Sequence, residues 1–380
     1  MTEEVTSIVI DNGSQNIRAG FSGDDEPRVI FSSVVGDVRF HNVMDCLGLK
    51  NSFVGNEAQE KRDILALKFP IKNGIVKDWD GVGKLWHHTF FDKLKVSPTE
   101  HPILLTEPLM NPTTNREKMA QIMFEQFNVP KLHVALQPIL SIFAAGLVTG
   151  IVVESGHGVT QILPIFEGCV QRNAIQRLNF GGSNLTDYLA KILTERGYYF
   201  ESTADLEVVR EIKERICYVA HDFDREMTTA ATSSSLEKSF ELADGTNIVF
   251  GNQCFRCAET LFQPHFLDFE SPSFPQMTYE SIMKCGIGLR KQLYSNVIVS
   301  GGNTLFPGFI ARFQNEMSSL APPTIKIDLK VLSKRENAVW TGGSILASLP
   351  TFQTEWSTKQ EYDEFGPSVL ERKFLDVFKP

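Results

Sequence analysis

Short apolar runs that end on turn-forming residues are the first pattern along the chain. Residues 7–10 are a β-branched run, residues 11–14 read Asp-Asn-Gly-Ser, and an apolar segment resumes over residues 17–21. β-Branched residues favour strands, whereas Asp, Asn, Gly and Ser favour turns. The pattern therefore predicts a β-hairpin at the start of the chain.

The opening pattern returns in the middle of the chain. Residues 151–157 read Ile-Val-Val-Glu-Ser-Gly-His and overlay residues 8–14, which read Ile-Val-Ile-Asp-Asn-Gly-Ser. A second strand is expected over residues 160–166, as it is after the first turn. Self-similarity of this kind indicates an internal duplication.

Helical periodicity separates and follows these strands. It predicts helices over residues 83–92, 114–127, 137–147, 186–196, 206–221 and 345–349. One further strand, residues 297–299, leads to a glycine pair, and the Ser-, Thr- and Ala-rich residues 228–239 are expected to form an exposed connection. Strands that alternate with helices predict an α/β fold with a sheet in each half of the chain.

Length, charge and composition argue against several classes of protein. The chain has 380 residues, enough for two medium domains or one large bilobed unit. Its formal net charge is −9 and it has no long basic run, which argues against nucleic acid as a ligand. The longest apolar stretch, residues 139–153, is shorter than a membrane span, and the acidic amino end does not resemble a secretory signal. Scattered cysteines are typical of reduced thiols, so we expect a cytoplasmic location.

Both turns have the composition of a phosphate site. Small residues after a strand let successive backbone N–H groups point into one concavity, which suits phosphate oxygens. The acidic residues at the two strand ends, Asp11 and Glu154, can hold the water ligands of Mg²⁺. A lone Asp-Asn-Gly is more often an ordinary hairpin turn. Two such turns, together with the glycines after residues 297–299, favour a nucleotide held between residues 11–15 and 154–158.

Long stretches throughout the chain resemble actin. They are residues 19–21, 23–25, 86–90, 104–107, 115–124, 193–198, 234–239, 281–285, 342–349 and 359–363. The resemblance implies the α/β, actin-like (actin, Hsp70 and sugar-kinase) ATPase fold, with two duplicated lobes around a nucleotide cleft. It also implies four subdomains: an outer lobe base of residues 1–32, 70–144 and 338–380, a small outer subdomain of residues 33–69 with a docking loop, an inner lobe base of residues 145–180 and 270–337, and an upper inner subdomain of residues 181–269.

Carried over residue by residue, the resemblance implies a Mg-ATP or Mg-ADP site. The phosphates would meet Gly13, Ser14, Gln15, Arg18, Gly156, His157 and Gly158. The adenosine would meet Gly182, Arg210, Lys213, Glu214, Gly301, Gly302 and Phe306. Asp11 and Glu154 would hold Mg²⁺ through water, and the expected catalytic residues are Gln137, which would position the attacking water, Gln161 and Glu154.

Several residues depart from the family pattern at this site. Actins have Asp-Ser-Gly-Asp-Gly where residues 154–158 read Glu-Ser-Gly-His-Gly, and Gln15, Gln161 and Glu336 replace a glycine, a histidine and a lysine. With one carboxylate fewer, we expect Mg²⁺ to bind more weakly, and a protonated His157 would oppose the cation. Gln161 can hydrogen-bond the attacking water but cannot shuttle its proton. We therefore expect retained nucleotide binding with slowed or impaired ATP hydrolysis.

Three functions remain open. The first is a divergent actin, a cytoskeletal subunit that assembles head-to-tail into filaments or co-assembles with actin-like subunits. The second is a non-hydrolysing actin-related pseudoenzyme, a nucleotide-stabilised subunit or cap of a larger assembly. The third, a metabolic kinase, needs a catalytic Asp and a sugar pocket that the sequence does not suggest. The docking loop, residues 39–51, and a groove lined by Phe143, Leu346 and Leu349 are the expected contacts with other subunits and actin-binding proteins.

Overall fold

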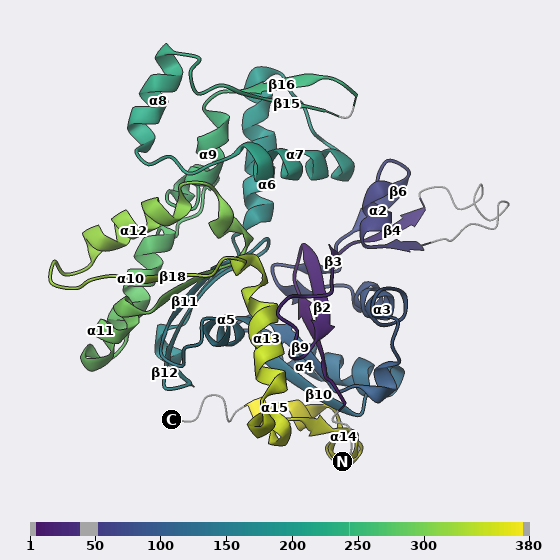
Figure 1. The fold of residues 1–380 in the computed structure, drawn as a ribbon. Coiled ribbons are helices and arrows are strands. Elements are labelled where there is room, and N and C mark those ends of the chain that lie inside the picture. The colour runs from purple at the N-terminus through teal and green to yellow at the C-terminus, as the bar shows by residue number, and fades with distance from the viewer. Residues whose placement is uncertain (1–4, 39–51, 243, 375–380) are drawn as a thin grey trace.

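The computed structural model describes residues 5–38, 52–242 and 244–374 of the chain, and two mixed β-sheets form its centre (Figure 1). The first sheet has the order β19-β10-β9-β1-β2-β3 and the second the order β13-β12-β11-β17-β18. The first consists of β1 (Ile8–Asn12), β2 (Asn16–Phe21), β3 (Val29–Ser32), β9 (Ile103–Glu107), β10 (Lys131–Leu136) and β19 (Ser357–Thr358). The second consists of β11 (Gly150–Ser155), β12 (Thr160–Phe166), β13 (Cys169–Val170), β17 (Val297–Ser300) and β18 (Leu329–Val331), with β14 (Gln176–Leu178) paired to β12.

The two sheets repeat one arrangement of strands. β1 pairs antiparallel with β2 and parallel with β9, and β11 likewise pairs antiparallel with β12 and parallel with β17. Every residue of β1 and of β11 is buried, as expected for strands that are covered on both faces. The predicted hairpins and the predicted α/β fold with a sheet in each half are therefore confirmed.

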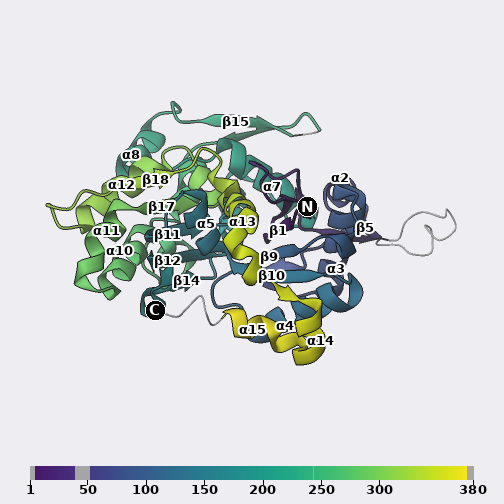
Figure 2. The same ribbon diagram turned by 60° about the horizontal axis from the view of Figure 1, so that its bottom comes forward.

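Two helices, α5 (Gln137–Ala144) and α13 (Ala338–Ser348), lie between the sheets and pack against each other (Figures 1 and 2). Their contact is so close that a Cβ atom at Gly342 would overlap the carbonyl oxygen of Leu140. The sequence predicted only residues 345–349 as helix, which was too short. Gly342 and Gly343 lie inside the helix, and Gly342 is the position at which α13 touches the backbone of α5, where a side chain has no room.

Further helices cover the two sheets. Beside the first sheet lie α3 (Trp79–His87), α4 (Thr113–Gln121), α14 (Lys359–Phe365) and α15 (Val369–Phe374), and a π-helical turn extends each of the first two (Figure 2). Beside the second sheet lie α10 (Phe274–Lys284), α11 (Ile287–Ser295) and α12 (Phe309–Leu320). A small sheet of β4 (Val35–Val38), β5 (Ser52–Val54) and β6 (Leu65–Lys68), with α2 (Asn56–Glu60), extends the side of the first sheet.

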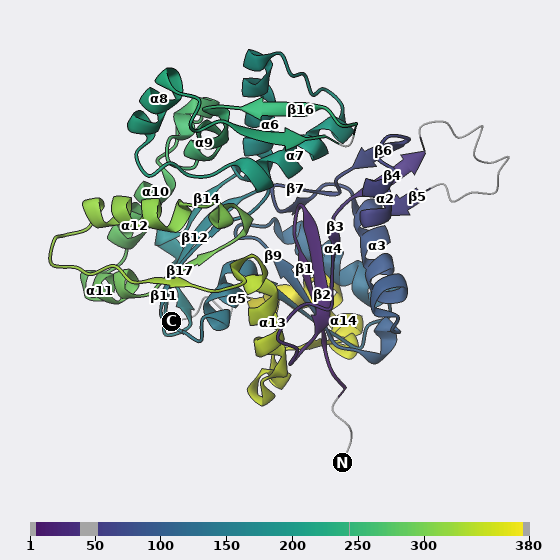
Figure 3. The same cartoon turned by 45° about the horizontal axis from the view of Figure 1, so that its top comes forward.

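A group of helices lies over one end of the second sheet (Figure 3). It consists of α6 (Gly182–Leu193), α7 (Thr203–Ile216), α8 (Phe223–Thr232) and α9 (Gln253–Glu259), with the hairpin of β15 (Lys238–Glu241) and β16 (Asn247–Phe250). The predicted connection over residues 228–239 was partly wrong. Its start belongs to α8, where the hydroxyls of Thr228, Thr229 and Thr232 donate to carbonyls one turn earlier. α7 also ends earlier than the predicted residue 221.

Replacing Gly342 by alanine is expected to destabilise the protein by about 3 kcal/mol or more, because the added methyl group forces α5 and α13 apart. In the described part of the chain, no atom of another element lies within 4 Å of the Cβ position of Gly83, inside α3, so G83A is the matched control. G83A is expected to be neutral or to raise the free energy of unfolding by about 0.5–1 kcal/mol. Urea melts followed by circular dichroism measure both variants. Equal stability of G342A and G83A would contradict the close contact between the helices.

Candidate functional site

A cavity of about 330 Å³ lies at the carboxyl ends of β1, β11 and β17. Ligands of α/β proteins usually bind at such strand ends. Most of the residues predicted from the sequence line it: Asp11, Gly13, Ser14, Gln15, Arg18, Gln137, Glu154, Gly156, His157, Gly158, Gly182, Lys213, Glu214, Gly301, Gly302 and Phe306. The fold thus brings together side chains that lie up to several hundred positions apart in the sequence.

The first wall of the cavity is the turn after β1, and buried hydrogen bonds fix it. The Asp11 carboxylate accepts from Thr106 Oγ1 at 2.8 Å and lies 3.4 Å from Arg18 Nη1. Asn12 donates to the carbonyl oxygen of Thr106 and accepts from Trp86 Nε1 at 3.0 Å. A rigid turn holds its backbone N–H groups in one orientation, which is what a phosphate site requires.

The second wall is the turn after β11, where Glu154 is buried beside Asp11. Burial, and then the Asp11 carboxylate, raise the pKa of Glu154 to about 8, although Arg18 counteracts part of this rise. Among the described residues, Glu154 Oε2 has no hydrogen-bond partner. Without a metal ion at this site, Glu154 therefore keeps its proton at neutral pH even beside Arg18, and a metal ion between the two carboxyl groups would favour its ionised form.

The second turn is tied to the start of α6. The carbonyl oxygen of Gly156 accepts from the backbone N–H of Gly182 at 3.0 Å and from Asn303 Nδ2 at 2.8 Å. The two walls meet at Gly158, where a Cβ atom would lie 2.8 Å from Ser14 Oγ and 2.9 Å from the backbone of Asn73. A glycine is therefore required where the two turns touch.

His157 carries no charge in the folded protein. Burial, and then Lys213 and Arg210, lower the pKa of His157 to about 3. The expectation that a protonated His157 would oppose a cation was therefore wrong. The sequence shows that the residue is a histidine, but its charge depends first on burial and then on cations contributed by another segment, α7.

Gln161 does not line the cavity, which corrects the prediction that it would hydrogen-bond an attacking water. Its amide oxygen accepts from the backbone N–H of Leu109 at 2.7 Å, and its Nε2 donates to Gln137 Oε1 at 3.3 Å. Gln137 Nε2 in turn lies 3.4 Å from Asp11 Oδ1. Gln161 is completely buried and holds Gln137 in place rather than contacting the cavity.

Arg210 was also misplaced by the prediction, since it lines a neighbouring cavity of about 370 Å³ instead. It is held there by Glu207 at 2.9 Å and Glu214 at 3.0 Å. Lys213 does reach the cavity, but its ammonium group donates to the Gly182 carbonyl oxygen at 2.7 Å and to Thr186 Oγ1 at 3.0 Å. Burial lowers the pKa of Lys213.

Glycine and apolar residues form the remaining wall, after β17. Gly301 has φ of 91°, and a Cβ atom there would overlap the backbone carbonyl group of Ser155, so only glycine fits. Gly302 faces open space, and Leu305, Phe306 and Val339 add apolar surface. The flat face of a base can approach such a wall closely.

Several cavity residues were not predicted from the sequence. They are Asn16, Gly74, Val159, Asn303, Leu305, Arg335 and Val339, together with Glu336, which was noted only as a departure from the family. Asn303 directly follows the predicted glycine pair, so its position was the one available signal. Gly74 donates to Ser14 Oγ at 2.9 Å from a different segment, and nothing in the sequence pattern points to it.

Unsatisfied polar atoms show that the cavity fits a polar ligand. Among the described residues, both amide atoms of Gln15, Glu154 Oε2 and Glu336 Oε2 are buried without a hydrogen-bond partner. Buried polar groups normally have partners, so these atoms indicate a site completed by something bound. No group of three or more His, Cys, Asp or Glu side chains among the described residues could hold a metal ion alone. Asp11 and Glu154 fit Mg²⁺ that keeps most of its water and phosphate ligands.

Comparison with known families agrees with this geometry. The family model described as actin matches residues 2–375, nearly the whole chain. The chain therefore belongs to the actin family, and it is a nucleotide-binding, actin-like protein with the actin-like ATPase fold. In the part of the chain that the structure describes, no helix has both the length and the hydrophobicity that a bilayer crossing requires.

The low pKa of His157 makes stability depend on pH. The folded protein keeps this imidazole neutral to about pH 3, whereas in the unfolded chain it binds a proton near pH 6.5. Below pH 6.5 the unfolded state binds one proton more, so folded stability falls as the pH falls. Relative to H157Q, the wild type should lose about 2 kcal/mol of unfolding free energy between pH 7.5 and pH 5, measured by urea melts.

Histidine NMR provides the direct check, with H157Q assigning the signal. The ring signals of His157 should stay constant between pH 5 and pH 8 in the folded protein. A transition near pH 6.5 would show that the imidazole is not buried beside Lys213 and Arg210 as described.

Proposed function

We propose that this protein is a divergent actin: a cytoplasmic, cytoskeletal subunit that binds Mg-ATP or Mg-ADP and assembles head-to-tail into filaments, with slowed ATP hydrolysis. The observation that carries this proposal is the cavity between two matching turns, within a chain that matches the actin family over residues 2–375. The four subdomains implied by the resemblance are part of the same proposal.

The phosphates would be bound chiefly by the two turns. Residues 13–15 and 156–158 line the cavity, but the N–H groups of Gly13 and Gly156 already donate to the carbonyl oxygens of Asp11 and Val159, so the phosphates would meet the N–H groups of Ser14, Gln15, His157 and Gly158. Gln15 is only 8% exposed, and both of its amide atoms lack a hydrogen-bond partner among the described residues. Arg18 adds a positive charge, because its guanidinium lines the same cavity. Mg²⁺, held through water by Asp11 and Glu154, would neutralise phosphate charge when bound.

Hydrolysis would be slow because Gln137 is restrained on both sides. Its amide oxygen, the acceptor that an attacking water would need, already accepts from Gln161, and its amide nitrogen is directed at Asp11. A misplacement of a reacting group by about 1 Å can cost roughly 100-fold in rate. Nucleotide binding does not depend on this side chain in the same way, so binding and hydrolysis would be separable.

Filament assembly is supported by exposed apolar residues near the ends of α5 and α13. Leu349 is 38% exposed, while Phe143 and Leu346 are half-buried, as expected for the proposed groove that receives a neighbouring subunit or an actin-binding protein. The docking loop, residues 39–51, lies outside the described residues. Self-association or co-assembly with actin-like subunits therefore stays a proposal.

The alternative is a non-hydrolysing pseudoenzyme that serves as a nucleotide-stabilised subunit or cap of a larger assembly. The observation that favours it is the altered second wall, where Glu154 is protonated without a cation and Gln161 holds Gln137. Both functions share the nucleotide site and differ in assembly.

Sedimentation with Mg-ATP and raised salt separates the two functions. Pelleting above a defined critical concentration is expected for the divergent actin, with phosphate released much more slowly than filaments form, because Gln137 is restrained. Monomer at every concentration would instead support the pseudoenzyme. Phosphate release that keeps pace with assembly, as fast as in ordinary actin filaments, would contradict the proposed slow hydrolysis.

The contact between the two turns gives a separate test of the nucleotide site. G158A places a methyl group 2.8 Å from Ser14 Oγ, so it should push the walls apart and weaken ATP binding at least about tenfold, or ~1.4 kcal/mol. A fluorescent ATP analogue and competition with ATP measure the dissociation constants of G158A, wild type and the distant control G83A. If G158A bound ATP as tightly as the control, the phosphates would lie elsewhere.

A further inference from the structure

Two neighbouring strands of the second sheet bind one backbone segment that belongs to the first. Gln161 of β12 and Arg177 of β14 are direct partners in the antiparallel pairing of these strands, so their side chains lie on the same face. Both reach Leu109, which follows β9. Gln161 Oε1 accepts from the Leu109 N–H at 2.7 Å, and Arg177 Nη1 donates to the Leu109 carbonyl oxygen. Both backbone polar groups of Leu109 are therefore bound by the second sheet.

Arg177 connects the two sheets through a second segment as well. Its Nη2 donates at 2.9 Å to the carbonyl oxygen of Asn73. The backbone of Asn73 lies against the second phosphate turn, where a Cβ atom at Gly158 would be 2.9 Å away. We call Gln161, Arg177 and the backbone groups of Leu109 and Asn73 that they bind the Leu109 latch.

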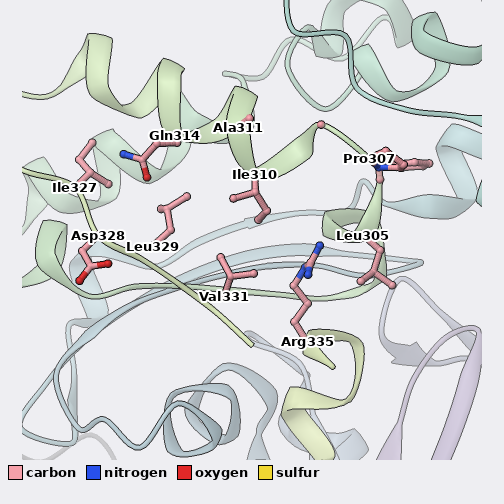
Figure 4. Close-up of a pocket in the computed structure, with 12 residues that line it drawn as sticks. Leu305, Pro307, Ile310, Ala311, Gln314, Ile327, Asp328, Leu329, Val331 and Arg335 are labelled. Atoms are coloured by element: carbon pink, nitrogen blue, oxygen red, sulfur yellow. The ribbon is translucent and has the colours of Figure 1, made fainter. Parts of the chain in front are cut away.

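The hydrogen bonds of Arg335, an arginine that lines the cavity itself, stay on one side of it. Arg335 donates through Nε to Thr304 Oγ1 at 3.0 Å and through Nη2 to the Thr304 carbonyl oxygen at 2.8 Å. Both residues lie in short 3-10 helices next to the second sheet. Figure 4 shows the Arg335 side chain near Val331 and Leu305, in an open hollow that adjoins the cavity. Arg177 differs because its hydrogen bonds join the two sheets.

The latch fixes the orientation of two glutamine amides. The Leu109 N–H is a donor, so the Gln161 amide must present its oxygen there. Gln161 Nε2 then points away from Leu109 and donates to Gln137 Oε1 at 3.3 Å, and Gln137 Nε2 lies 3.4 Å from Asp11 Oδ1. Turning either amide over would bring two donors or two acceptors together. The backbone of Leu109 therefore determines which way Gln137 faces.

This chain of hydrogen bonds ends at the residue expected to position the attacking water. Gln137 lines the cavity, whereas Gln161 and Leu109 are buried behind it. The latch thus acts on the cavity through Gln137, whose amide oxygen is directed at Gln161 instead of at a water. Because the latch joins the two sheets, a change in their relative position would break it and release Gln137.

We propose that the Leu109 latch restrains ATP hydrolysis, with Arg177 and Gln161 as positioning residues that keep the Gln137 oxygen from the attacking water. The proposal rests on the proposed nucleotide function and assigns its slow hydrolysis to named contacts. Opening the latch would raise the rate of ATP cleavage. The affinity for ATP would change little, because neither Arg177 nor Gln161 lines the cavity.

Single-turnover cleavage of ATP tests the proposal on the whole protein. Radiolabelled Mg-ATP is mixed with excess protein at low salt, and the ADP formed is measured after an acid quench, so product release does not enter. Q161M removes both hydrogen bonds of the amide and should raise the cleavage rate about tenfold, within the roughly 100-fold that a misplacement of about 1 Å can cost. R177M leaves Gln161 bound to the Leu109 N–H and should raise the rate about threefold. The dissociation constant of ATP, measured by competition with a fluorescent analogue, should stay within about twofold of wild type.

Two matched control variants separate the latch from a general loss of stability. Q253M removes a buried glutamine whose amide oxygen accepts from the Gly251 N–H at 2.9 Å. R290M removes a half-buried arginine that donates to the carbonyl oxygens of Met283 and Cys285. Neither Gln253 nor Arg290 lines the cavity, so both variants should cleave ATP at the wild-type rate.

A double variant and a conservative variant show whether Arg177 acts through Gln161. The double variant of R177M and Q161M should cleave ATP no faster than Q161M alone, because both changes break the same chain of hydrogen bonds. R177K keeps one donor group and should give a rate between those of wild type and R177M. Rates that multiply in the double variant would show that Arg177 acts by another route and would overturn the latch.

Unchanged or slower cleavage in Q161M and R177M, with ATP still bound, would overturn the inference and leave the proposed function intact. The same conclusion would follow if the two controls accelerated cleavage equally. R177M alters a half-buried side chain, so it decides the question even if Q161M does not fold. Failure of the wild type to bind ATP would overturn the proposed function, and the inference with it.

Discussion

The nucleotide cavity depends on the close contact between α5 and α13. α5 follows β10 in the first sheet and packs on β11 in the second, while α13 packs on β1 and donates from Trp340 Nε1 to the Val9 carbonyl oxygen at 3.0 Å. The pair therefore fixes the distance between the two sheets, and the sheets carry the two phosphate turns. Gly342 is the point at which this contact has no room for a side chain. A wider spacing would separate Ser14 from Gly158 and open the cavity.

The cavity between the two sheets contains buried polar groups that have no hydrogen-bond partner among the described residues. Asp11 is hydrogen-bonded and paired with Arg18, but Glu154, Gln15 and Glu336 each have a buried polar atom without a hydrogen-bond partner among the described residues. Such groups lower the stability of the folded protein. A ligand that binds only the folded state and supplies hydrogen-bond partners raises that stability again. The cavity is therefore built for occupancy by a ligand with donors, acceptors and associated cations.

The sequence predicted the fold better than it predicted the side-chain contacts. The β-branched runs and turn residues located both hairpins, because strand and turn preferences are local. The start of α13 was missed because Gly342 and Gly343 are poor helix formers. Their small size is needed by the backbone of α5 at Gly342 and by Val9 of β1 at Gly343, and the sequence does not place either element beside them. Gln161 and Arg210 were assigned to the cavity by position, but Gln137 with Leu109, and Glu207 with Glu214, hold them outside it. The charge of His157 could not be predicted because it depends on burial beside α7.

Apart from Gln15, which stands where the resemblance implies a glycine and does not have a positive φ, the departures from the family pattern do not involve glycines of the cavity, and this distinction bears on function. Gly13, Gly156, Gly158, Gly301 and Gly302 all remain, so the backbone surface that approaches a nucleotide is retained. Residues 154, 157, 161 and 336 have changed, and each acts through a side chain whose chemistry can change without moving the backbone. A phosphate held by backbone N–H groups tolerates such changes, whereas an attacking water held by one glutamine does not. In this fold, sequence divergence would therefore alter hydrolysis before it abolishes nucleotide binding.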